Sequence, residues 1–175
     1  MKKVITILLT FILFSTASYA QWRSNPEFRL GYGYYESFNF GMSLELRSDN
    51  RIGFGAGTNY MINNVRYYSV FIEDNLAVFR SRRYNFLEYK WFLTGKIIYW
   101  NREDDQYRFK VLSLAPAITR CIPLNSRVNL TIDAGPVFNI VLGSYRKTDQ
   151  AHGWPDLIMP NIRLLLNIKL SGEGN

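Results

Sequence analysis

The sequence predicts an all-β fold, an eight-stranded antiparallel up-and-down barrel that crosses a membrane. Apolar and polar residues alternate along eight segments, which is the period of a β-strand and not of a helix. Several segments are longer than most strands of soluble domains. Long strands without covering helices must hide their edges, and closure into a barrel removes every edge.

The clearest segment is Arg127 to Leu142. Every second residue from Val128 is apolar, whereas the other face is largely polar and carries the carboxylate of Asp133. About 11 residues of a strand tilted near 45° cover the apolar thickness of a membrane. This segment is therefore long enough to cross one.

Seven further segments repeat the alternation with varying regularity. Glu73-Asp74-Asn75 interrupts one of them, which predicts a bulge or a split strand there. In another, Leu112 and Leu114 keep one parity while Tyr107 and Phe109 have the other, which indicates a slip of phase. The predicted segments are Phe28–Tyr35, Phe38–Arg47, Arg51–Tyr60, Val65–Phe79, Phe86–Trp100, Tyr107–Thr119 and Leu157–Leu170.

Three prolines lie within these segments, and a closed barrel has no edge on which to hide their missing donors. We expect Pro160 at a strand start, and Pro116 and Pro136 at bulges or local breaks in pairing. Arg120–Ser126, with Pro123, is expected to be a turn.

The first 20 residues have the pattern of a secretory signal peptide. Lys2 and Lys3 precede an apolar run from Val4 to Phe14, and Ser18-Tyr19-Ala20 predicts cleavage before Gln21. Residues 21–175 then form one barrel domain. We expect no catalytic residue, cofactor or metal, because the single Cys121 and the single His152 lie far apart in sequence. The net charge of +7 is spread along the chain, so a nucleic-acid partner is not expected.

The charged face is predicted to line the barrel interior, and the apolar face to contact lipid. Six glycines share the charged face, where they leave room for long side chains from the far wall. These glycines are Gly31, Gly33, Gly41, Gly53, Gly55 and Gly57. The predicted interior charged network consists of Glu45, Arg47, Arg51, Glu88, Lys90, Lys96, Asp133, Arg163 and Lys169.

An even number of strands places both termini on the periplasmic side of an outer membrane. The charged segment Asn101–Gln106 and the long segment Gly143–Asp156 then form outward loops. The expected partners are outer-membrane lipid, the barrel-insertion machinery, and an extracellular ligand at the outward loops.

Residues 112–143, LSLAPAITRCIPLNSRVNLTIDAGPVFNIVLG, resemble the small outer-membrane β-barrel family described as porin-like or PorT-like. The likeness lies in the strand–turn–strand layout and in the Ala134-Gly135-Pro136 step. It implies a fold and a compartment but no catalytic residues. The chain departs from many outer-membrane barrels in ending LSGEGN, without a final aromatic residue.

The leading hypothesis is a non-enzymatic outer-membrane barrel with a filled polar interior, acting in envelope structure or in surface binding through its outward loops. A lipid-modifying enzyme is the second hypothesis, since Ser144, His152 and the carboxylates Asp149 and Asp156 lie in one outward segment. A narrow pore and a soluble periplasmic lipocalin-like carrier are the remaining alternatives.

Overall fold

The computed structural model describes residues 25–33, 37–47, 50–59, 66–82, 88–103, 107–146 and 156–170. These residues form eight β-strands. They include no helix long and apolar enough to cross a membrane. The strands are β1 (Asn25–Gly33), β2 (Ser37–Arg47), β3 (Asn50–Thr58), β4 (Arg66–Arg82), β5 (Glu88–Glu103), β6 (Tyr107–Pro123), β7 (Val128–Arg146) and β8 (Ile158–Lys169).

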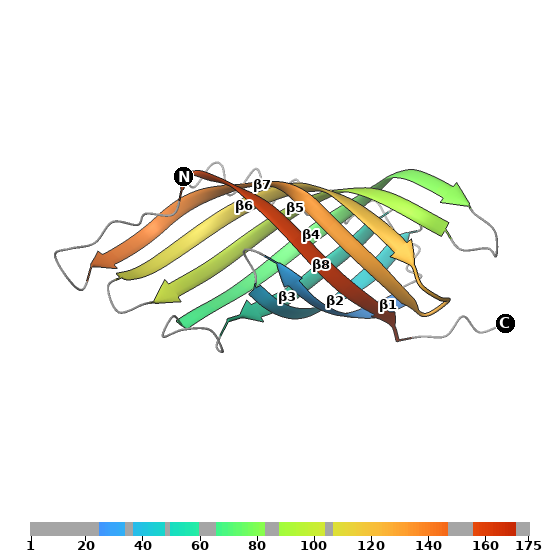
Figure 1. Ribbon diagram of the computed structural model, residues 1–175, viewed down its shortest axis with the longest axis horizontal. Helices are drawn as coiled ribbons and strands as arrows, with labels where there is room; N and C mark the ends of the chain where they lie inside the picture. Colours follow the sequence, from blue (N-terminus) through green and yellow to red (C-terminus); the bar gives the residue numbers. More distant parts are fainter. Residues whose placement is uncertain are drawn as a thin grey trace.

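Each strand pairs with the next in antiparallel orientation, and β1 also pairs with β8, so the sheet closes into a barrel (Figure 1). The predicted all-β, eight-stranded up-and-down fold is confirmed. β1 to β3 have 9 to 11 residues, whereas β4 to β7 have 16 to 19. The long hairpins therefore extend past the short strands at the ends of the barrel (Figure 1).

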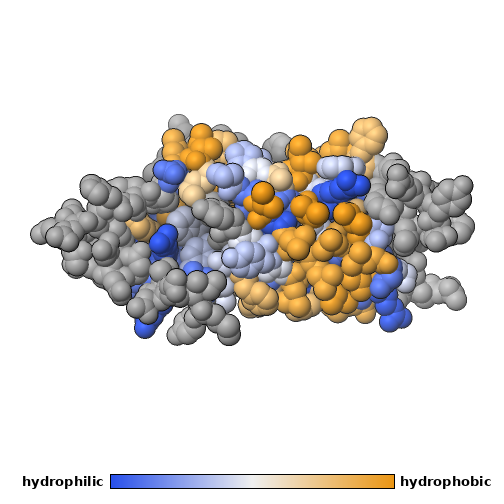
Figure 2. All heavy atoms as spheres, in the orientation of Figure 1, coloured by the Kyte–Doolittle hydropathy of each residue, from blue (hydrophilic) through white to orange (hydrophobic). Residues whose placement is uncertain are grey.

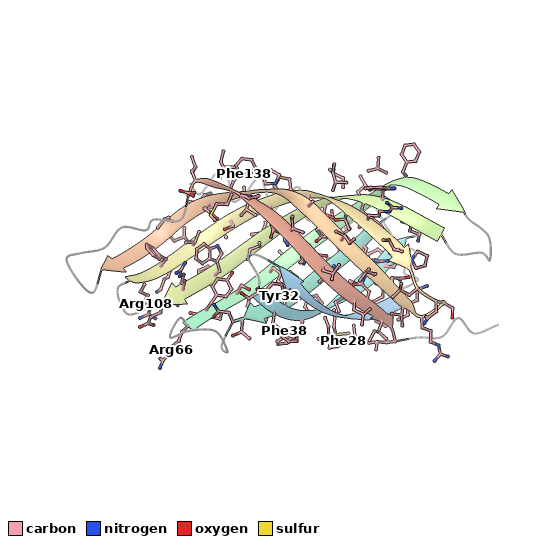
Figure 3. All side chains as sticks on the ribbon, in the orientation of Figure 1. Phe28, Tyr32, Phe38, Arg66, Arg108 and Phe138 are labelled. Atoms are coloured by element: carbon pink, nitrogen blue, oxygen red, sulfur yellow. The ribbon has the colours of Figure 1, made fainter. Side chains whose placement is uncertain are left out.

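The outer face of the barrel is apolar. On β7, Ile132, Phe138 and Ile140 point outward and are 37%, 39% and 47% exposed. Phe38 and Phe138 point away from the barrel in Figure 3, and apolar residues gather over β1 and β8 in Figure 2. Thr131 and Asp133, the two neighbours of Ile132 in the chain, are buried inside. The alternation read from the sequence therefore separates an apolar exterior from a buried interior.

β4 differs from its predicted form. The chain continues as one strand through Glu73, Asp74 and Asn75, which pair regularly with both β3 and β5. The irregularity lies later, between Ala77 and Phe79, where the register with β5 shifts. Successive side chains of a strand face opposite sides of the sheet, so Glu73 and Asn75 are buried inside while Asp74 lies on the outer face.

β6 also differs from prediction. It extends to Pro123, so residues 120–123, expected in a turn, are still in the strand. Its phase does not slip, because Phe109, Val111 and Cys121 are all buried on the inner face. The sequence suggested a slip because apolar residues lie on the inner face near the start of this strand and on the outer face further along it. The register with β7 shifts between Lys110 and Val111.

The prolines lie where pairing is weak. Pro160 is the third residue of β8, near its start, as expected. The β6–β7 ladder runs to Leu114 paired with Phe138 and resumes at Ile118 paired with Ala134. Pro116 and Pro136 lie within this gap, which is the predicted local break in pairing. A missing N–H group costs least where no ladder hydrogen bond is required.

Candidate functional site

The centre of the barrel interior is a cluster of buried charges around Glu73. Its carboxylate binds the guanidinium groups of Arg29 and Arg163, with 2.6 Å between Glu73 Oε2 and Arg163 Nη2. The three side chains come from β4, β1 and β8, and each is at most 5% exposed. Buried charges are stable only when paired and hydrogen-bonded, and here one carboxylate serves two cations.

Hydrogen bonds extend this cluster around the wall. Arg163 Nε donates to Asp133 Oδ2 at 2.6 Å, and Arg29 Nε donates to Asn167 Oδ1 at 3.1 Å. On the other side, Asn75 Nδ2 donates to Glu73 Oε1 at 3.0 Å, and Asn75 Oδ1 accepts from Thr94 Oγ1 at 2.7 Å. The network thus joins side chains from five strands of the barrel and fills its cross-section.

Two further ion pairs lie nearer the end of the barrel that carries Asn25 and Lys169. Arg51 Nη1 is 3.0 Å from Glu27 Oε2, which also accepts a 3.3 Å hydrogen bond from Ser43 Oγ. Lys90 Nζ donates to Glu45 Oε1 at 3.1 Å. Arg51 also stacks its guanidinium over the ring of Phe92, 5.4 Å from the centroid. These contacts fill this half of the interior with paired charges.

The predicted network residues are placed as follows. Arg51, Lys96, Asp133 and Arg163 are buried inside, and Lys169 is half-buried at the end of β8. Glu45 and Lys90 are partly buried and form a pair. Arg47 and Glu88 belong to β2 and β5, and their side chains lie outside the part of the chain that the structure describes. The ion pairs therefore join the predicted residues in small sets, not in one cluster.

Three important members were not predicted, namely Glu27, Arg29 and Glu73. Glu73 was hidden because its triplet resembles a turn, and Glu27 because it precedes the predicted start of its strand. Arg29 was detectable: it lies in β1 on the face that also carries Gly31 and Gly33.

Gly53 provides the space that this cluster needs. A Cβ atom at Gly53 would lie 2.9 Å from Glu73 Cγ and would also meet the guanidinium of Arg29. We expect Gly53→Ala to lower the free energy of unfolding by about 1–3 kcal/mol, because it overpacks the ion pair. Chemical denaturation of the reconstituted protein measures this. Gly95→Ala is the matched control, since nothing lies within 4 Å of its Cβ position; an equal loss there would contradict the argument.

The other half of the interior contains an apolar cluster, which departs from the expected polar filling. Eight buried side chains pack together there, with Val141 and Met159 against them. They are Tyr67, Phe71, Ile98, Trp100, Phe109, Val111, Ala115 and Val137. Val137 comes from the middle of β7, and the others come from the first half of β4 and β6 and the second half of β5. The cluster therefore lies toward the end of the barrel where β3, β5 and β7 finish.

Phe71 joins the two halves. Its ring lies 5.5 Å from the Arg163 guanidinium and 6.0 Å from Lys96 Nζ, measured to the ring centroid. Three polar side chains beside the apolar cluster form a chain of hydrogen bonds: Trp100 Nε1 donates to Ser113 Oγ at 2.8 Å, and Ser113 Oγ donates to Asn139 Oδ1 at 2.6 Å. The interior is thus filled from both ends by side chains that contact each other.

Within the described ranges, no three His, Cys, Asp or Glu side chains are grouped so as to hold a metal ion. The residues named for the lipid-modifying enzyme hypothesis fall mostly outside these ranges. Asp149 and His152 are not described, nor is the side chain of Ser144, while Asp156 is exposed before β8. The predicted signal peptide and its predicted cleavage site likewise lie outside the described residues.

No protein-family model matches the sequence, and no curated protein matches it either. Among solved structures, the chain is similar to the crystal structure of Acinetobacter baumannii CarO, with 10% identity and a TM-score of 0.35. The match covers 82% of this chain and 96% of that chain. Because the sequence identity and the TM-score are this low, the similarity indicates nothing about the role of this chain.

Proposed function

We propose that the protein is an integral outer-membrane β-barrel without an open channel, which acts in envelope structure or in surface binding through its outward loops. The observation that carries this proposal is the distribution of polarity. Large apolar side chains such as Ile162 and Leu93, 64% and 55% exposed, cover the outside, while Glu73 and Arg163 are buried within. A water-soluble barrel would bury the apolar face instead.

The secretory pattern of residues 1–20 and the likeness of residues 112–143 to the porin-like or PorT-like family support the outer membrane as the location. Both of these observations are features of the sequence. The barrel needs no helix to cross the membrane, because paired strands satisfy the backbone hydrogen bonds.

The filled interior favours a non-conducting barrel over a narrow pore. An eight-stranded barrel is just wide enough to be filled by its own side chains. Here the Glu73 cluster fills one level of the barrel interior, and the apolar cluster around Phe71 and Trp100 fills the adjacent level. Ions would have to break buried ion pairs and then pass through apolar packing.

Two measurements test the proposal. After expression with its own leader, the protein should fractionate with the outer membrane and migrate faster on a gel when unheated than when boiled. In planar bilayers it should give no steady single-channel conductance. Recovery from the soluble periplasm would support the carrier hypothesis instead. Steady conductance would show that the interior opens, and would refute the closed barrel while leaving its location intact.

A further inference from the structure

Three long cationic side chains lie on the outer wall at the end of the barrel where β3, β5 and β7 finish. Arg66 is the first residue of β4, and Arg108 and Lys110 are near the start of β6. Their chain neighbours Tyr67 and Phe109 are buried inside, so all three cations face outward, and they are exposed. Arg66 and Arg108 extend from this same end of the barrel in Figure 3.

The strand register brings the three cations close together. Arg66 pairs with Glu103 of β5, and Glu103 pairs with Arg108 of β6. Lys110 pairs with Asn101, two residues before Glu103. Neighbouring strands are about 4.8 Å apart, so β4 and β6 are separated by roughly 10 Å. Long side chains from both strands can therefore reach one ligand that lies over β5.

The charge of this group suits a phosphate. Glu103 is its one carboxylate, and the pair that Glu103 Oε2 forms with Arg108 Nε is exposed and long, at 3.9 Å. Among the described residues, Arg66 and Lys110 have no ion-pair partner. Three cations and one carboxylate leave a net charge of +2 on these side chains. A phosphate monoester carries about −1.5 to −2 near neutral pH and has three strong acceptor oxygens.

Tyr68 adds a hydrogen-bond donor beside the cations. Its hydroxyl oxygen accepts a 2.8 Å hydrogen bond from Asn101 Nδ2, and Asn101 is only 3% exposed. A hydroxyl both accepts and donates, so the Tyr68 proton can be given to an anion while the buried amide holds the oxygen in place. We call Arg66, Tyr68, Arg108 and Lys110 the cation patch.

The wall below the cation patch is apolar. Val70 and Ile72, the next outward residues of β4, are 52% and 45% exposed. Tyr68 lies 11 residues before Phe79, the last large apolar residue on this face of β4. At about 3.3 Å per residue and a tilt near 45°, this stretch covers about 26 Å of depth, close to the apolar band of about 25 Å in membrane barrels. Arg66 then lies at the level of the headgroups.

We propose that the cation patch binds the phosphate-monoester headgroup of a membrane lipid, whose acyl chains lie along the apolar wall below it. The inference rests on the proposed membrane location. A soluble phosphate would use the cations but not the wall, whereas a lipid contacts both. Arg120, near the other end of β6, differs because its guanidinium stacks on the ring of Trp91, 5.1 Å from the centroid.

Quenching by lipids with brominated acyl chains tests the site. Cys121 is buried and is the single cysteine, so Cys121→Ala gives a background in which Ile72→Cys carries one fluorophore on the wall below the patch. The protein is reconstituted in phosphatidylcholine vesicles that contain a minor fraction of one brominated lipid. Brominated phosphatidic acid, a phosphate monoester, should quench more strongly than brominated phosphatidylglycerol or phosphatidylcholine, which are diesters, at the same fraction.

Substitutions in the patch should remove this preference. A Lys or Arg near a membrane surface strengthens the binding of anionic lipid roughly 5-fold, so Arg66→Gln combined with Lys110→Gln should weaken the binding of phosphatidic acid roughly 25-fold. Tyr68→Phe keeps the ring and loses the donor, and should weaken it roughly 2- to 10-fold. Arg120→Gln removes the same charge at the other end of the barrel and is the matched control, with no change expected.

Gel mobility and fractionation of every variant separate the two proposals. If the unsubstituted protein is not in the outer membrane, the proposed function fails. If it is inserted and heat-modifiable, but phosphatidic acid quenches no more than the two diester lipids, the lipid site is refuted and the membrane location stands. Displacement of phosphatidic acid by an equal concentration of inorganic phosphate would refute a lipid as the occupant. An equal loss with Arg120→Gln would show that net charge, not the patch, attracts the lipid.

Discussion

Glu73→Gln should lower the free energy of unfolding by about 3–5 kcal/mol. The substitution keeps the shape of the side chain but removes the negative charge between Arg29 and Arg163, which are 4% and 0% exposed. The positive charges of the two buried guanidinium groups would then lie together without a carboxylate between them. A cation left without its counter-ion in a buried site accounts for most of such a loss.

Urea unfolding of the barrel in lipid vesicles measures this effect, followed by tryptophan fluorescence. Glu103→Gln is the matched control, because Glu103 and Arg108 are 3.9 Å apart and their side chains are 32% and 48% exposed. That change should cost about 1 kcal/mol or less. If the two variants lose equal stability, the Glu73 cluster is not the electrostatic centre of the barrel.

Leu164→Arg should lower the free energy of unfolding in lipid by about 2–4 kcal/mol, because it places a cation midway along β8 on the outer surface, which contacts lipid in the barrel proposed above. Leu164 is 48% exposed, so the new side chain meets no internal obstacle. In a water-soluble barrel the same substitution would add a charge to a hydrated surface and change little.

Leu170→Arg is the control for depth. Leu170 follows the last residue of β8 and is 57% exposed, which places it near the membrane boundary of the proposed barrel, so its replacement should cost roughly 0–1 kcal/mol. Both variants are unfolded by urea in vesicles of the same lipid. A Leu164→Arg protein as stable as the wild type would contradict the assignment of the outer face.

The strands and the direction of their faces could be predicted from the sequence. Alternation is a local property, and β7 shows an apolar residue at every second position from Val128 to Leu142, so Asp133 and Phe138 were assigned to opposite sides without any knowledge of pairing. Strand ends were less accurate, as in β6, because Pro123 was taken as the mark of a turn.

The interior could not be predicted in the same way. Which charges meet depends on register, and the register shifts at bulges near Leu46 and Val78 and between Lys110 and Val111. The apolar half was missed for another reason. Alternation separates inside from outside only when the inside is polar, and Phe109 and Val111 are apolar residues on an inner face.

The charged cluster also bears on how the barrel closes. β1 and β8 form the last ladder, with seven paired residues from Glu27 to Gly33 on β1. Arg29 lies on one side of this seam and Arg163 on the other, and both bind the same carboxylate on β4. An open sheet would leave at least one of these cations without Glu73. Completion of the ion pairs and closure of the seam are therefore one event, and partly opened barrels with exposed strand edges are disfavoured.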